Sequence, residues 1–112
     1  MNSRIIPALA ALAALTLLPG AALRAAPPAG GGGRITIKNF MFAPASLTIK
    51  AGGSVTWVNE DEEPHTVVSA TGAFRSQAMD TKDSYTFKFD KPGEYHFICT
   101  IHPQMMGTVI VQ

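Results

Sequence analysis

The sequence predicts an all-β sandwich, and three observations support this fold class. From residue 34 onward, short runs alternate between apolar and polar residues, as strands with one buried face do. Turn signals containing Gly, Pro or acidic residues separate these runs at intervals of about 8–12 residues. After the first 25 residues, no stretch keeps a convincing helical period. Short alternating strands with frequent turns are typical of a β-sandwich.

Seven runs are predicted as strands. The expected strands are 34–38, 47–49, 55–59, 65–69, 84–89, 94–99 and 107–111. In the first of them, Ile35 and Ile37 share one face. In the fifth, Tyr85, Phe87 and Phe89 share a face in the same way.

The connections between these strands also have readable patterns. Phe40, Phe42 and Pro44 predict an aromatic turn, and residues 60–64 form an acidic loop. Residues 70–82 have no clear period and are expected to be an excursion, with room for one helical turn. Gly107 is expected to allow a sharp return into the last strand.

A leader is expected ahead of the domain. Residues 1–25 have the features of a secretory signal peptide, with an apolar run at 8–18 followed by Pro19-Gly20 and small residues. Cleavage is expected after Ala22 or Ala25. The apolar run is shorter than the roughly 20 residues that cross a bilayer, which favours a cleaved leader over a membrane anchor. After removal of the leader, no membrane insertion is expected.

A linker and one small domain follow the leader. Residues 26–33 are rich in Gly and Pro and predict a flexible linker. Residues 34–112 then form a single domain, near the size at which a bound metal adds useful stability. This domain carries seven basic and eight acidic side chains, for a net charge of −1. No basic patch of the kind that nucleic-acid binding needs is visible.

The most informative segment lies near the carboxyl end. Cys99, His102 and Met105 follow the spacing C-x-x-H-x-x-M directly after a predicted strand. A thiolate, imidazoles and a weak thioether are the ligand set of a mononuclear copper electron-transfer centre. Cys99 is also the single cysteine of the chain, so it cannot form an internal disulfide. Metal coordination would protect this thiol outside the cytosol.

Strand parity selects the second imidazole. Tyr95, Phe97 and Cys99 share the face that the aromatic residues mark as the core side, and His96 has the opposite parity. His96 is therefore expected at the surface, which leaves His65 and His102. The predicted site joins His65 from the scaffold to the loop that begins at Cys99.

With these residues in place, the chain resembles the cupredoxins, the type 1 blue copper proteins, and within them the amicyanin and plastocyanin group. Three stretches carry the resemblance: residues 42–59, Pro64-His65-Thr66-Val67, and Gly93-Glu94-Tyr95 leading to the segment 99–105. The resemblance implies a Greek-key cupredoxin fold and one type 1 copper ion. The implied ligands are His65, Cys99, His102 and an axial Met105.

The chain departs from the family pattern at one position and is ambiguous at another. Thr66 stands where the best-known members have an asparagine that donates to the site, and a hydroxyl is expected to donate instead. Met106 is adjacent to Met105 and offers a second register for the axial ligand; the short loop favours Met105.

The function expected from these observations is one-electron transfer in the periplasm, without enzymatic activity. The implied partner is a periplasmic dehydrogenase or a c-type cytochrome, bound transiently. The protein itself is expected to be a monomer. The acidic loop 60–63 is expected to be solvated, or to steer a basic partner. An alternative is a periplasmic copper-binding or delivery protein that uses the same ligands together with Met106.

Overall fold

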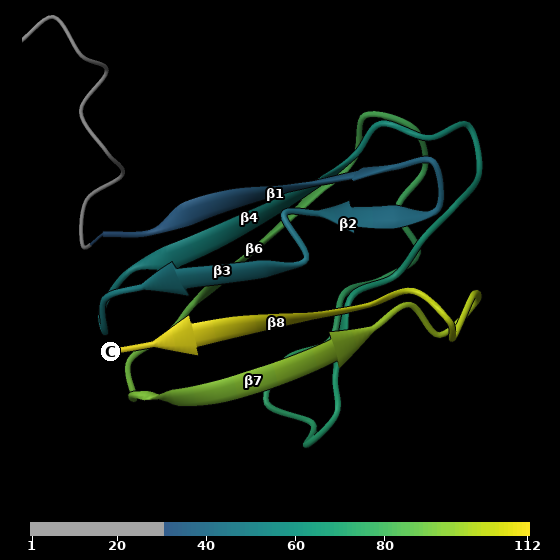
Figure 1. Cartoon of the computed structure of the whole chain (residues 1–112). Coiled ribbons are helices and arrows are strands. Elements are labelled where there is room, and N and C mark those ends of the chain that lie inside the picture. Colours follow the sequence, from purple (N-terminus) through teal and green to yellow (C-terminus); the bar gives the residue numbers. More distant parts are fainter. Residues whose placement is uncertain (1–30) are drawn as a thin grey trace, which may run out of the picture.

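The computed structural model describes residues 31–112, which form two packed β-sheets (Figure 1). The predicted signal peptide and most of the predicted linker lie outside the described residues. Gly33, the last residue of that linker, already pairs with Val55. None of the described residues forms a helix that is long and apolar enough to cross a membrane.

Each sheet has four strands, and each contains one parallel pair. The first sheet has the order β2-β1-β4-β6 and the second has the order β3-β8-β7-β5. The pairs β1–β4 and β3–β8 are parallel, and the other neighbours are antiparallel. The strands are β1 (Gly33–Lys38), β2 (Met41–Ala43), β3 (Ser46–Ile49), β4 (Ser54–Asn59), β5 (Val68–Ser69), β6 (Ser84–Lys88), β7 (Gly93–Ile98) and β8 (Met106–Val111).

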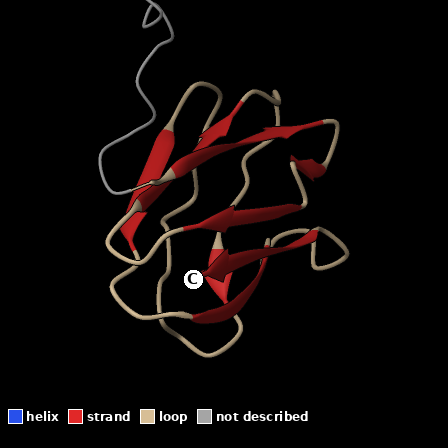
Figure 2. Ribbon diagram, turned by 60° about the vertical axis from the view of Figure 1, so that its left-hand side comes forward, coloured by secondary structure: helices blue, strands red, loops and turns tan. Residues whose placement is uncertain are grey.

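The alternation in sequence matches the burial of the strands. Ile35 and Ile37 of β1 are fully buried, as are Val109 of β8 and Phe97 of β7. These side chains line the space between the two sheets, which appear as separate layers of strands in Figure 2. The predicted β-sandwich of short alternating strands is therefore confirmed, and its inward-facing residues form the core.

An aromatic cluster centred on Trp57 fills the middle of this core. The Trp57 ring is fully buried and lies within 6.4 Å, between ring centroids, of four other aromatic rings. These rings belong to Phe74, Tyr85, Phe89 and Phe97. Each buried aromatic side chain stabilises the fold by roughly 1.5–3 kcal/mol. This cluster joins the two sheets and packs against Phe97 near the end of β7, the strand that leads to Cys99.

Two local predictions of strands and turns were wrong. Residues 41–43, expected within a turn, pair with β1 as strand β2, while Asn39 and Phe40 make the turn with left-handed φ angles of 53° and 57°. The strand expected over residues 65–69 is regular only at Val68–Ser69. Residues 70–82 form the expected excursion; they contain no helical turn, and isolated bridges join Met79 to His65 and Arg75 to Val68.

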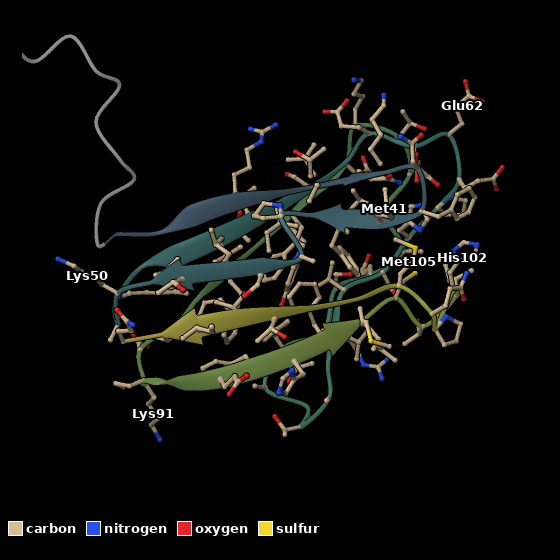
Figure 3. All side chains as sticks on the ribbon, in the orientation of Figure 1. Met41, Lys50, Glu62, Lys91, His102 and Met105 are labelled. Carbon is tan, nitrogen blue, oxygen red and sulfur yellow. The ribbon has the colours of Figure 1, made fainter. Side chains whose placement is uncertain are left out.

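The two ends of the sandwich differ. Figure 3 shows Met41, Glu62, His102 and Met105 at one end, whereas Lys50 and Lys91 lie at the other. The first end collects the turn between β1 and β2, the acidic loop after β4 and the loop between β7 and β8 (Figure 1). All of the predicted site residues belong to this end.

Candidate metal centre

Three predicted ligands meet at this end of the sandwich. Nδ1 of His65 lies 3.7 Å from Sγ of Cys99, and Nδ1 of His102 lies 3.8 Å from the same sulfur. The three donor atoms all lie within 4.8 Å of one another. His65 and Cys99 are fully buried, and His102 is half-buried. The fold thus brings together residues that are 34 positions apart in the sequence.

The backbone of His65 is held by a two-way bridge. His65 N–H donates to the Met79 carbonyl over 3.1 Å, and Met79 N–H donates to the His65 carbonyl over 2.8 Å. On the other side of the ring, Nε2 of His65 lies 2.9 Å from Oδ2 of Asp61. The ring is therefore fixed between a carboxylate and the sulfur, with Nδ1 directed at Cys99.

The loop that carries the other ligands is closed by its own backbone. Cys99 N–H donates to the Met105 carbonyl over 3.1 Å, and Met105 N–H donates to the His102 carbonyl over 2.9 Å. These bonds fold the loop back on itself, so that two donors three residues apart can converge. Short spacing and backbone hydrogen bonds within the loop bring these donors together.

Thr66 provides donors to the sulfur, as expected from its hydroxyl. Its backbone N–H lies 3.4 Å from Sγ of Cys99, and its hydroxyl lies 3.8 Å from the same atom. The hydroxyl oxygen also accepts a 2.8 Å hydrogen bond from Thr100 N–H. We call His65 and the residues that hold it the scaffold half of the site, and the loop from Cys99 to Met105 the loop half. Thr66 links the two halves, and it directs two donors at the sulfur.

The two adjacent methionines have different surroundings. Met105 is 3% exposed and packs in the core, whereas Met106 is 63% exposed. Figure 3 shows Met105 next to His102 at the loop end. A buried thioether suits a weak axial ligand better than an exposed one, so the burial favours Met105 over Met106.

Two residues of the site were not expected from the sequence. The ring of Phe40 lies edge-on to both imidazoles, with its centroid 5.4 Å from that of His65 and 5.0 Å from that of His102. Asp61 was expected only as part of a solvated acidic loop. Phe40 reaches the site through a tertiary contact, and Asp61, four positions before His65, is not distinguished by any motif from the other acidic residues of its loop.

The charge of Asp61 is stabilised by its neighbours. Burial raises the pKa of this carboxyl, but hydrogen bonds from Phe40 N–H, Asn39 N–H and His65 outweigh burial and hold the pKa below its ordinary value. Asp61 therefore faces the His65 ring as an anion at neutral pH.

The expectation for His96 is confirmed. Its side chain is 62% exposed, and its Nδ1 lies 3.0 Å from the hydroxyl oxygen of Thr108 on β8. His96 thus faces away from the cluster, as its parity in β7 predicts.

The donor set fits copper. A buried sulfur with two N–H or O–H donors aimed at it is suited to a thiolate, and both nearby imidazoles turn Nδ1 toward it. Thiolate with imidazole and a thioether is the combination that copper electron-transfer sites use, whereas zinc sites make little use of thioethers.

Comparisons with known proteins agree with this geometry. A family model described as a cupredoxin-like domain matches residues 8–111. Amicyanin-alpha of Methylorubrum extorquens is 36% identical over 94% of this chain and 93% of its own length. A chloroplastic plastocyanin of Tetradesmus obliquus is 41% identical over 64% of this chain and 59% of its own length. The Cu(I) structure of an amicyanin variant superposes with a TM-score of 0.69 at 28% identity, covering 72% of this chain and 82% of that one.

Proposed function

The chain belongs to the cupredoxin family, and from this premise we propose that it is a one-electron carrier built around a single copper site. The observation that carries the proposal is the convergence of one sulfur and two imidazole nitrogens within 4.8 Å. Copper in such a site supplies the Cu(II)/Cu(I) couple. With four protein ligands, the site has no open position for a substrate, and we therefore propose no enzymatic reaction.

The proposed ligands are His65, Cys99 and His102, with Met105 as a long axial contact. Hydrogen bonds or burial hold each of these side chains in place without a metal, although His65 is held more rigidly than His102. A ligand set held in this way changes little between the two charge states, which favours fast electron exchange.

The half-buried ring of His102 is the proposed route for the electron to the surface. Four large apolar side chains are exposed in the described part of the chain, and all come from the two segments that flank this ring: Phe40, Met41, Ile101 and Met106. We define these four residues as the apolar face. A small apolar face around a redox exit suits a brief encounter with a partner protein.

The proposed partner is a periplasmic redox protein, either a dehydrogenase or a c-type cytochrome, with an apolar contact patch of its own. Glu62 and Glu63 are exposed beside the apolar face, so basic residues at the rim of the partner would be attracted to them. The predicted leader at residues 1–25 supports export to the periplasm.

Two measurements on the domain from residue 31 to 112 test the proposal. Addition of Cu(II) should produce an intense thiolate-to-copper band that bleaches on reduction, and voltammetry should show a fast, reversible one-electron couple. Met41→Lys and Ile101→Lys should slow electron exchange with a partner and leave the band unchanged. Lys88→Glu, on an exposed strand residue of β6, is the control for an altered surface charge. A colourless, redox-silent protein would contradict the proposal.

A copper-delivery role is the second candidate. It is favoured by the exposed thioethers of Met41 and Met106, which are 59% and 63% exposed and are soft ligands that suit Cu(I). Transfer of copper to an acceptor apoprotein together with slow electron exchange would support this role. Fast reversible voltammetry without loss of metal would exclude it.

A further inference from the structure

Asp61 has more polar contacts at the metal end than its place in an acidic loop suggests. Its side chain is only 11% exposed. One carboxylate oxygen accepts from Asn39 N–H at 2.6 Å, and the other accepts from Phe40 N–H at 2.9 Å and lies 2.9 Å from Nε2 of His65. Its own N–H donates to the side-chain oxygen of Asn59 over 2.9 Å. This carboxylate is built into the fold.

We propose that Asp61 is a positioning residue that sets the tautomer of His65 and biases the site toward Cu(II). The part of the proposal that concerns copper rests on the proposed function. The part that concerns the tautomer rests only on the protein.

The tautomer follows from the hydrogen-bonding roles. An ionised carboxylate only accepts hydrogen bonds, so the proton of a neutral His65 ring must be on Nε2. The lone pair is then on Nδ1, the atom that lies 3.7 Å from Sγ of Cys99. Asp61 therefore selects the one neutral form of the ring in which the nitrogen facing the sulfur can bind a metal.

The carboxylate is fixed, so it cannot follow the ring if the ring rotates. The two N–H groups that hold it come from the left-handed turn at Asn39 and Phe40. Thr81 adds a hydrogen bond to the Asp61 carbonyl over 2.7 Å. Because the carboxylate is held by backbone N–H groups and not by the ring alone, it defines the ring orientation before any metal binds.

The bias toward Cu(II) follows from charge. A buried anion one imidazole away from the metal stabilises the doubly charged ion more than the singly charged one. By accepting a hydrogen bond from Nε2, the Asp61 carboxylate also makes the His65 ring a stronger electron donor to the metal. Both effects favour Cu(II), so removal of the charge should raise the reduction potential.

The first test uses the wild-type protein without metal. Histidine ¹⁵N NMR distinguishes the two neutral tautomers directly. We expect His65 to carry its proton on Nε2. A His65 ring with its proton on Nδ1 would overturn the proposal, whether or not the protein binds copper.

The second test compares Asp61→Asn with Glu62→Gln. Each change removes one negative charge, but Glu62 is exposed and has no contact with His65 among the interactions of the described residues. Asp61→Asn should lower the Cu(II) affinity by roughly 10–100-fold, as loss of such supporting contacts does. The Cu(I) affinity should fall several-fold less, so that the potential rises.

Glu62→Gln should change both affinities by less than about twofold, because an exposed charge is screened by solvent. Equal shifts in the two variants would overturn the proposal, since they would reduce Asp61 to one charge among several. A purely structural role in the turn would lower the stability of Asp61→Asn but would leave the tautomer and the potential unmoved. Should that variant fail to fold, the wild-type tautomer still decides.

Discussion

The two imidazoles of the site are held in contrasting ways. His65 is fully buried, its backbone is bridged to Met79, and its ring lies between Asp61 and Cys99. His102 is half-buried on a short loop, and among the described residues its ring nitrogens contact only Cys99. The scaffold therefore holds one ligand rigidly, and the loop presents the other at the surface.

This difference separates two tasks that one site must perform. A fixed ligand preserves the geometry of the centre, while a ligand at the surface lets electrons pass to another protein. Phe40 connects the two, because its ring contacts both imidazoles. The scaffold half is expected to control the properties of the metal, and the loop half is expected to control exchange.

The largest expected effect concerns the sulfur that both halves share. Cys99→Ser should abolish the blue band completely, because the band requires a thiolate ligand. His96→Ala is the matched control, since His96 lies on β7, the strand that leads to Cys99, but faces solvent. Optical titration with Cu(II) measures both variants. Loss of colour in His96→Ala would break the assignment of the ligands by strand parity.

The next prediction separates the two imidazoles directly. His102→Gly should lose the blue band and regain most of it when free imidazole is added, because a half-buried position admits a small molecule. His65→Gly should show little recovery, because its cavity is closed on all sides by the core. Optical spectra with increasing imidazole measure the recovery. Equal recovery in both variants would show that the two sites do not differ in access.

Thr66→Val tests the connection between the two halves. The change keeps the side-chain shape and the backbone N–H bond to Cys99, but it removes the hydroxyl from the sulfur and leaves Thr100 N–H without its acceptor. The free energy of unfolding should fall by about 1–3 kcal/mol. The potential should also fall, because one donor to the sulfur is lost and the thiolate then favours Cu(II).

The control for this prediction is Thr56→Val. Thr56 forms an exposed hydroxyl–hydroxyl contact of 2.8 Å with Thr86 between β4 and β6, whereas Cys99 follows β7 of the other sheet. Its loss should cost less than about 0.5 kcal/mol in denaturant unfolding. A potential that moves equally in both variants would contradict the role assigned to Thr66.

The smallest expected effect lies at the surface of the scaffold half. Glu60 pairs with Lys82, and the hydrogen bond from that ammonium group lowers the pKa of the Glu60 carboxyl. A carboxyl whose pKa is lower in the folded state stabilises the fold above its unfolded pKa of about 4.3. This stabilisation is lost as the pH falls through the folded pKa.

Glu60→Gln should therefore be slightly less stable than the wild type at pH 7 and equal to it near pH 3. Urea unfolding of the metal-free proteins at both values measures the difference, and added salt should reduce it at pH 7. A difference that grows on acidification would reverse the sign of the argument. A large difference in the free energy of unfolding at pH 7 would contradict the small contribution assigned to this exposed ion pair.

The loop half of the site was predictable from the sequence, and most of the scaffold half was not. The spacing of Cys99, His102 and Met105 is local, so the pattern can be read without knowledge of the fold. His65 was identified by the parity of His96, which excluded the alternative, and by the resemblance carried by Pro64-His65-Thr66-Val67. Asp61 lies only four positions before His65, but nothing in the sequence distinguishes its carboxylate from the other acidic residues of the loop, whereas Phe40 reaches the ring through the turn between β1 and β2.

The strands show the same limit. Long alternating runs such as Gly33–Lys38 were predicted closely, because their burial depends on their own sequence. Met41–Ala43 and the segment around residues 65–69 were not, because their hydrogen bonds depend on the neighbouring chain. Gly107 was expected for its backbone freedom. Its role is space: a Cβ there would lie 2.5 Å from the Phe97 ring.

The most direct test of the central claim is X-ray absorption at the copper edge of the copper-loaded domain, combined with metal analysis. The account predicts one copper per chain with one short sulfur ligand and two imidazole nitrogens, and loss of one nitrogen in His65→Gly. Copper bound without sulfur, or coordination unchanged when His65 is removed, would show that the three donor atoms do not hold one ion together.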